Sequence, residues 1–147
     1  MSAALAIITM RDADLEDCER VFAWNCAPEV RALSGDPRII ELAEHQRWYR
    51  RRVVGGWMWI VEDENAPVGV VRLDPYGGVM RISIALSTKA RGRGIGQRAI
   101  RAACEAYGLP IEALIRAGNT RSTACFHACG FTLAEVTEEF VTYRWSP

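Results

Sequence analysis

The sequence lacks a net charge, and this absence limits its partners. Eighteen basic residues balance eighteen acidic ones across 147 residues. A neutral chain has no long-range field that would draw in a nucleic acid or an anionic membrane surface. We therefore expect neither as a partner, and any site for an anion has to be built locally.

The sequence also lacks a long hydrophobic run and a positively charged N-terminal segment. No apolar stretch approaches the roughly 20 residues that cross a bilayer, and the opening residues contain no basic side chain before Arg11. The five cysteines are odd in number and unevenly spaced, which favours reduced thiols. These absences predict a cytoplasmic protein without a membrane span.

What is present is the composition of an ordinary globular protein. Half of the residues are hydrophobic and 24% are charged, and a chain of this length can bury one substantial core but not two. We therefore treat residues 1–147 as a single domain.

Hydrophobic periodicity, caps and glycine stops predict an α/β fold of the α+β type. A helix capped by Asp12 or Asp14 should present Leu15, Cys18 and Phe22 on one apolar face and end near residues 25–28. The other predicted helices are a short segment at 29–33, then 39–54, 95–107 and 119–129. The predicted strands are 5–10, 57–63, 67–74, 79–87, 109–116, 131–136 and 140–145.

The stretch KARGRGIGQRAI, residues 89–100, places three glycines between a strand and a helix. Such a turn presents unpaired amide groups together with the positive end of the helix dipole, which suits an anion. Glycine lets a phosphate approach the backbone closely. The run is neither a Walker A loop nor a dinucleotide fingerprint, because Gln97 follows the last glycine. A turn that only links strand to helix is the alternative.

The run Arg91-Gly92-Arg93-Gly94-Ile95-Gly96 resembles the Arg/Gln-x-x-Gly-x-Gly/Ala signature of the GNAT family of N-acetyltransferases. Residues 119–131 resemble the family's second conserved block, and the order of elements is similar over nearly the whole chain. The resemblance implies a mixed, mostly antiparallel sheet of about seven strands flanked by about four helices. It also implies acetyl-CoA as cosubstrate.

The resemblance further assigns cofactor-binding residues. Residues Arg91, Gly92, Arg93, Gly94, Ile95 and Gly96 would supply backbone amides to the pyrophosphate. Ile84 and Leu86 would pair with the pantetheine arm, where strand 79–87 separates from strand 109–116. Asn119 would hydrogen-bond the arm, and Phe126 would flank the thioester end.

Acetyl transfer needs a neutral amine, yet a primary amine with a pKa near 10 is neutral in about one molecule per thousand at pH 7. The strand at 79–87 lacks the glutamate that many relatives carry. His45 is the preferred base, because its helical spacing places it on one face with Trp48 and Tyr49. A packed histidine is the alternative, and Ser83 acting through water is a weaker candidate, as are Glu62 and Asp74.

The sequence also departs from the family pattern at the proton donor to the coenzyme A sulfur. Phe126 stands where the family carries a tyrosine, so Tyr143 is the proposed replacement. Cys125 and Cys129 share a helix face from which His127 points away, so we expect no metal site.

The acceptor is predicted to be a small-molecule amine. Residues 45–49 and 67–73 are similar to acetyltransferases of the pseudaminic acid pathway, which implies a nucleotide-linked amino sugar. Arginines 47, 50, 51 and 52 either hold its phosphates or form a solvated helix end. A protein N-terminus, as in ribosomal-protein acetyltransferases, and a non-catalytic acetyl-CoA sensor are the alternatives. The sequence leaves the oligomeric state open, a homodimer included.

Overall fold

The computed structural model describes residues 7–33 and 38–147. The sequence Ser-Gly-Asp-Pro predicts a turn at residues 34–37, which lie outside these ranges. The elements are β1 (Ile8–Asp12), α1 (Cys18–Asn25), α2 (Pro28–Ala32), α3 (Leu42–Val53), β2 (Met58–Asp63), β3 (Ala66–Tyr76), β4 (Val79–Leu86), α4 (Ile95–Tyr107), β5 (Ile111–Arg116), α5 (Thr120–Ala128), β6 (Thr132–Val136) and β7 (Phe140–Trp145). Short 3₁₀ turns, Leu15–Asp17 and Thr88–Ala90, precede α1 and follow β4.

The described strands form one seven-stranded sheet in the order β1-β2-β3-β4-β5-β7-β6. Every neighbouring pair is antiparallel except β4 and β5, which are parallel. This mixed, mostly antiparallel sheet confirms the predicted fold class. Five α-helices flank it within the described ranges, as the periodicity predicted and one more than the resemblance implied.

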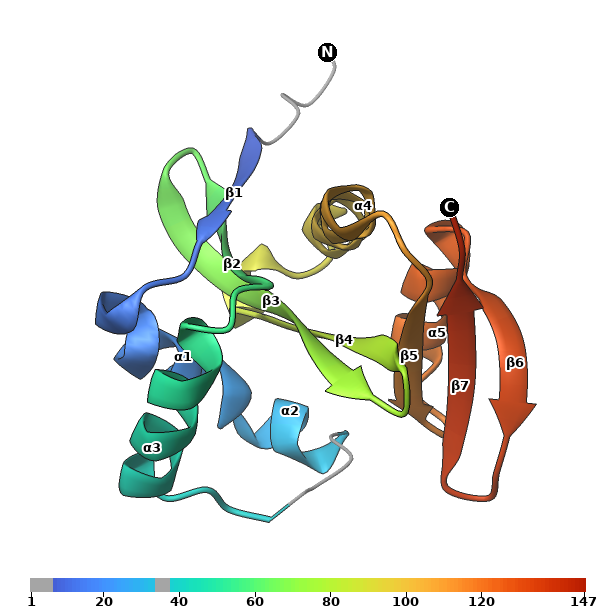
Figure 1. The fold of residues 1–147 in the computed structure, drawn as a ribbon, viewed down its shortest axis with the longest axis horizontal. Coiled ribbons are helices and arrows are strands. Elements are labelled where there is room, and N and C mark those ends of the chain that lie inside the picture. The colour runs from blue at the N-terminus through green and yellow to red at the C-terminus, as the bar shows by residue number, and fades with distance from the viewer. Residues whose placement is uncertain (1–6, 34–37) are drawn as a thin grey trace.

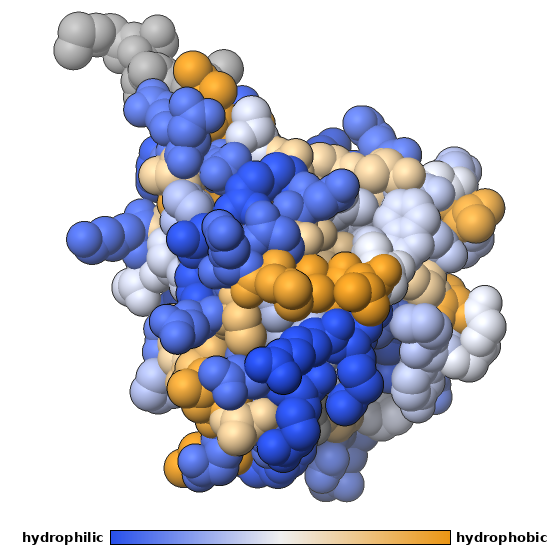
Figure 2. Space-filling view, turned by 60° about the vertical axis from the view of Figure 1, so that its left-hand side comes forward, coloured by the Kyte–Doolittle hydropathy of each residue, from blue (hydrophilic) through white to orange (hydrophobic). Residues whose placement is uncertain are grey.

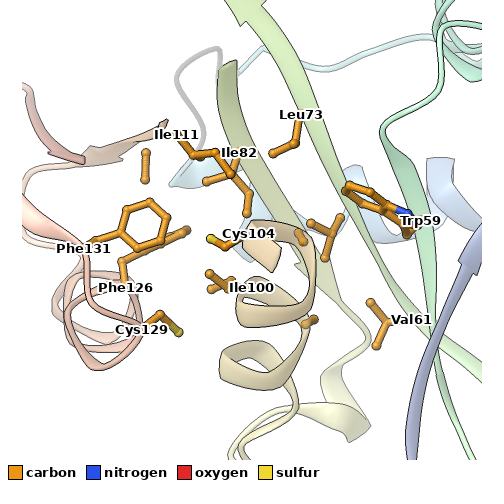
Figure 3. Packing of buried hydrophobic residues seen from close by; sticks show 14 of the residues in the cluster. Trp59, Val61, Leu73, Ile82, Ile100, Cys104, Ile111, Phe126, Cys129 and Phe131 are labelled. Atoms are coloured by element: carbon orange, nitrogen blue, oxygen red, sulfur yellow. The ribbon is translucent and has the colours of Figure 1, made fainter. Parts of the chain in front are cut away.

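The helices cover the two faces of the sheet and create two separate cores. In Figure 1, α4 lies on one side of the sheet and α1, α2 and α3 lie on the other. The larger core packs α4 and α5 against alternate residues of the strands, and Figure 3 shows Ile100 and Cys104 of α4 among Ile82, Ile111 and Phe131. The smaller core joins α1 and α3 to Ile60 and Val70.

The start of α1 corrects one sequence prediction. Asp14 caps the 3₁₀ turn, and a capping box closes when its backbone N–H donates to Asp17 at 2.9 Å. Because this tighter turn shifts the helical phase, Val21 is the buried residue of α1 and Leu15 is 61% exposed. The prediction of one apolar face from residues 15, 18 and 22 is therefore wrong for Leu15, which does not lie on the buried face.

The surface is mixed in character. Figure 2, which turns the side formed by β1, α1 and α3 forward, shows hydrophilic side chains over most of this face and a narrow hydrophobic band between them. Among the described residues, no helix has both the length and the apolar character needed to cross a membrane.

Candidate active site

Strands β4 and β5 form a fork. They pair only at Met80 with Ile111 and at Arg81 with Glu112, although each strand continues beyond this point. The edge of β4 that faces β5 is therefore unpaired with it from Ile82 to Leu86. An unpaired strand edge is a template for an extended chain, so the strand separation implied by the resemblance is present.

The glycine run forms an open turn between β4 and α4. Gly92 and Gly94 have φ of 76° and 75°, a left-handed conformation that side chains rarely adopt. A Cβ built on either glycine would meet nothing within 4 Å. Gly94 is the N-cap of α4 and no side chain caps this helix. The first amides of α4 therefore lack a side-chain cap and lie at the positive end of the helix dipole.

The turn and the fork meet at Gly96. A Cβ on this glycine would lie 3.6 Å from Leu86 Cδ1, 3.9 Å from Ile84 Cδ1 and 3.6 Å from Cys125 Sγ. The structure thus brings together three of the predicted cofactor residues, from β4 and the first turn of α4, beside the face of α5.

These features agree with the comparison with protein families. The family model for the acetyltransferase (GNAT) domain matches residues 8–132. The chain belongs to the GNAT family. It is an N-acetyltransferase that takes its acetyl group from acetyl-CoA and passes it to an amine, as the sequence predicted.

Solved GNAT structures share the fold. Spermidine N-acetyltransferase from Vibrio cholerae, solved with CoA and spermine, has a TM-score of 0.81 at 15% identity over 94% of each chain. A GNAT acetyltransferase from Bacillus anthracis has a TM-score of 0.80 and 17% sequence identity, over 95% of this chain and 94% of its own. Ribosomal-protein-alanine N-acetyltransferase from Brucella melitensis has a TM-score of 0.75 and 20% sequence identity, over 95% of this chain and 99% of its own. No curated protein sequence matches.

Both arginines of the GNAT turn are engaged in ion pairs. Arg91 Nη1 lies 3.1 Å from Glu29 Oε1 on α2, and its Nη2 donates to the carbonyl oxygen of Leu86 at 3.2 Å. Arg93 Nη2 lies 2.9 Å from Asp63 Oδ2 at the end of β2. The sequence placed these cations at the turn but gave no sign of their distant acidic partners.

Asn119 and Phe126 have structural roles at α5. The side-chain oxygen of Asn119 accepts from Ser122 N–H at 3.3 Å and so caps the helix. Phe126 is 5% exposed, and its ring meets Phe131 edge to face with centroids 5.0 Å apart (Figure 3). The cap therefore uses one of the two lone pairs of the Asn119 side-chain oxygen, and Phe126 offers an apolar wall.

His45 lies in the smaller core. It is 4% exposed, its Nε2 lies 2.9 Å from the carbonyl oxygen of Cys18, and its ring packs against Trp48 and Tyr49. Burial lowers its pKa, so the ring is neutral at pH 7. The Nε2 atom has to carry the proton for this bond, which leaves only Nδ1 to accept another. Contact with an acceptor would require the aromatic cluster to open.

Ser83 and Tyr143 lie on opposite faces of the sheet near the fork. Ser83 is half-buried on β4, opposite Arg72, on the face away from α4. Tyr143 is half-buried against the core under α4 and pairs in register with Ala113, one residue beyond the last β4–β5 pair. The structure therefore brings both residues to the region of the fork, whereas His45 lies in the smaller core, on the same side of the sheet as Ser83.

A buried carboxylate at the fork was missed by the sequence reasoning. Glu112 on β5 is 5% exposed and bonds to Arg81 and Arg144. The local signal was an acidic residue between the apolar residues of the stretch IEALI, residues 111–115.

The thiols of α5 lie against α4. Cys129 is buried and Cys125 is half-buried, whereas His127 is exposed. A hydrogen bond from Cys125 lowers the pKa of Cys129, and Arg101 adds to the effect. Within residues 7–33 and 38–147, no group of three or more His, Cys, Asp or Glu could hold a metal ion.

Proposed function

We propose that this GNAT chain acetylates the primary amine of a nucleotide-linked amino sugar, with the diphosphate of acetyl-CoA at residues 91–96. One observation carries the cofactor placement: the uncapped start of α4 and the unpaired edge of β4 meet at Gly96. The uncapped helix start suits a diphosphate, and the unpaired strand edge suits an extended arm that carries amide groups.

The cofactor residues would act mainly through the backbone. The amides of Ile95, Gly96 and Gln97 would donate to the phosphates, while Ile84 and Leu86 would bond the arm as a neighbouring strand does. Arg91 and Arg93 would exchange Glu29 and Asp63 for phosphate oxygens. Asn119 would donate its amide N–H to the arm, with the ring of Phe126 near the arm's end.

Acetyl transfer requires a deprotonated amine and a coenzyme A sulfur that can act as leaving group. Acetyl-CoA supplies an activated acetyl group, and a thiol with a pKa near 8.5 is a tolerable leaving group. We propose that Ser83 holds a water that relays the amine proton to bulk solvent, and that Tyr143 donates a proton to the leaving sulfur and is reprotonated from solvent. His45 stays a candidate base only if its cluster opens, and the pH test described in the Discussion decides its role.

Charge supports an anionic acceptor. On the sheet face away from α4, Arg52, Arg72, Arg81 and Arg144 surround two carboxylates, Asp74 and Glu112. A surface with this surplus of arginine attracts phosphate and repels a polycation. A nucleotide-linked sugar fits it better than a polyamine does.

The test is a mass-spectrometric acceptor screen with acetyl-CoA. The panel contains nucleotide-linked amino sugars, the same amino sugars without nucleotide, spermine, and peptides with a free N-terminus. We expect transfer to the nucleotide-linked compounds and much slower transfer to the free sugars. Preference for spermine or a peptide would reject the proposed acceptor, and cofactor binding without release of coenzyme A by any amine would favour the sensor alternative.

A further inference from the structure

A row of alternating charges crosses the sheet at the root of the fork. Asp74 on β3, Arg81 on β4, Glu112 on β5 and Arg144 on β7 are successive register partners. Their neighbours along the strands face the larger core, namely Leu73, Ile82, Ile111, Ala113, Tyr143 and Trp145. Because side chains alternate along a strand, the charged row lies on the opposite face, away from α4.

Glu112 fixes the two arginines of this row. Its Oε1 accepts from Arg81 Nε at 2.9 Å and its Oε2 accepts from Arg144 Nε at 3.2 Å. A carboxylate that is 5% exposed needs both cations to offset its loss of water. The guanidinium of Arg81 also lies 3.4 Å from the centre of the Tyr76 ring. Arg81 is therefore held in place from two sides.

Both arginines reach Glu112 through Nε and leave their outer edges available. Within the described part of the chain, no hydrogen bond engages an Nη atom of Arg81 or Arg144. Their side chains are 23% and 63% exposed. A fixed, planar guanidinium with a free Nη edge is the geometry that binds phosphate with parallel hydrogen bonds.

The surrounding charges keep this site positive. Asp74, the register partner of Arg81, is already bonded to Arg52 at 2.6 Å and to Arg72 at 2.8 Å. Four arginines thus share two carboxylates, and two positive charges remain uncompensated within this group. An ammonium group would be repelled from it, whereas a phosphate would be attracted.

We propose that Arg81 and Arg144, positioned by Glu112, bind a phosphate of the acceptor. This inference rests on the proposed function and adds to it a site for the nucleotide end. Ser83 lies on the same face two residues along β4, roughly 6.6 Å away at the usual strand rise. One sugar ring can span that distance, which would place the amine beside Ser83 while the phosphate stays at the arginines.

The experiment measures binding of uridine diphosphate by calorimetry to protein saturated with coenzyme A, so that the turn at residues 91–96 is filled. Arg81→Lys and Arg144→Lys keep the charge beside Glu112 but remove the Nη edge. Each should weaken uridine diphosphate binding about tenfold, since a charge-assisted hydrogen bond is lost. Arg20→Lys on α1, which likewise keeps a charge beside a buried carboxylate, Asp17, is the matched control and should change nothing. Uridine, which has no phosphate, should not bind.

Three outcomes overturn the proposal: equal affinity in the wild type and both lysine variants, loss of binding when coenzyme A is present, or equal binding of uridine. If Arg81→Lys fails to fold, the more exposed Arg144→Lys carries the test, with thermal unfolding as the check. Calorimetry does not require acetyl transfer. A failed acceptor screen with intact binding would therefore reject the proposed function alone, and the reverse result would reject the phosphate site alone.

Discussion

The thiol of Cys125 lies directly beside Gly96, so close that a Cβ on Gly96 would be 3.6 Å from its Sγ. This is ordinary van der Waals contact, as are the distances to the methyl groups of Leu86 and Ile84. One methyl group therefore fits between β4 and α5 without displacing either, whereas a branched side chain does not.

We predict opposite results for two substitutions at Gly96. Gly96→Ala should raise the free energy of unfolding by about 0.5–1 kcal/mol, because alanine stabilises a helix relative to glycine, and should leave acetyl-CoA affinity unchanged. Gly96→Val should lower that affinity at least about tenfold by filling the space beside Ile84 and Leu86. Thermal unfolding and calorimetry measure the two effects. Equal acetyl-CoA affinity in both variants would place the arm elsewhere.

We predict that Gly94→Glu abolishes acetyl-CoA binding, because it puts a carboxylate where the diphosphate is placed. Gly94 has φ of 75°, so the substitution also strains the backbone by about 1–3 kcal/mol. Gly56→Glu is the matched control, since Gly56 has φ of 73° and equally open surroundings. Both variants should lose similar stability, and only Gly94→Glu should lose calorimetric binding. Normal binding by Gly94→Glu would remove the diphosphate from this turn.

Much of the fold could be predicted because its boundaries are encoded locally. Gly108 ends α4 with a positive φ, and Asn119 caps α5 through its side chain. The family resemblance implied the fork, but the charged row that crosses it could not be predicted. Glu112 bonds to arginines 31 and 32 residues away, and no periodic pattern links positions so far apart.

His45 illustrates the same limit within a helix. Spacing correctly placed it on one face with Trp48 and Tyr49. Whether that face turns toward a pocket or toward a core depends on the packing of α1 against α3, through Cys18 and its neighbours. The local sequence does not determine that packing.

We predict that Glu29→Gln strengthens acetyl-CoA binding by about twofold to fivefold, the scale of an exposed ion pair. Glu29 pairs with Arg91 and would compete with the proposed diphosphate for it, so removal of its charge would leave the arginine available. The gain should shrink at high salt. Glu44→Gln, which breaks the exposed pair with Arg38, should leave the dissociation constant unchanged. Weaker binding by Glu29→Gln would mean that Glu29 orients Arg91 rather than competes for it.

We predict that acid destabilises the protein partly through His45. Burial lowers the pKa of His45 in the folded state, so the unfolded chain binds a proton first as the pH falls through about 6.5. The free energy of unfolding should therefore decrease as the pH drops below about 7, with a slope of at most about 1.4 kcal/mol per pH unit from this group. His45→Gln, which keeps an N–H for the Cys18 carbonyl, should show a shallower decline.

Thermal unfolding between pH 5 and pH 8 measures this difference, and His127→Gln removes the other, exposed histidine as the control. Parallel curves for wild type and His45→Gln would show that His45 is not held neutral by burial. The same variant decides the catalytic role of His45. If it is the base, kcat should fall more at pH 7 than at pH 9, where the amine deprotonates unaided. If His45 only packs the smaller core, kcat should change by the same factor at pH 7 and pH 9. Ser83 with its water then remains as the proposed route for the amine proton.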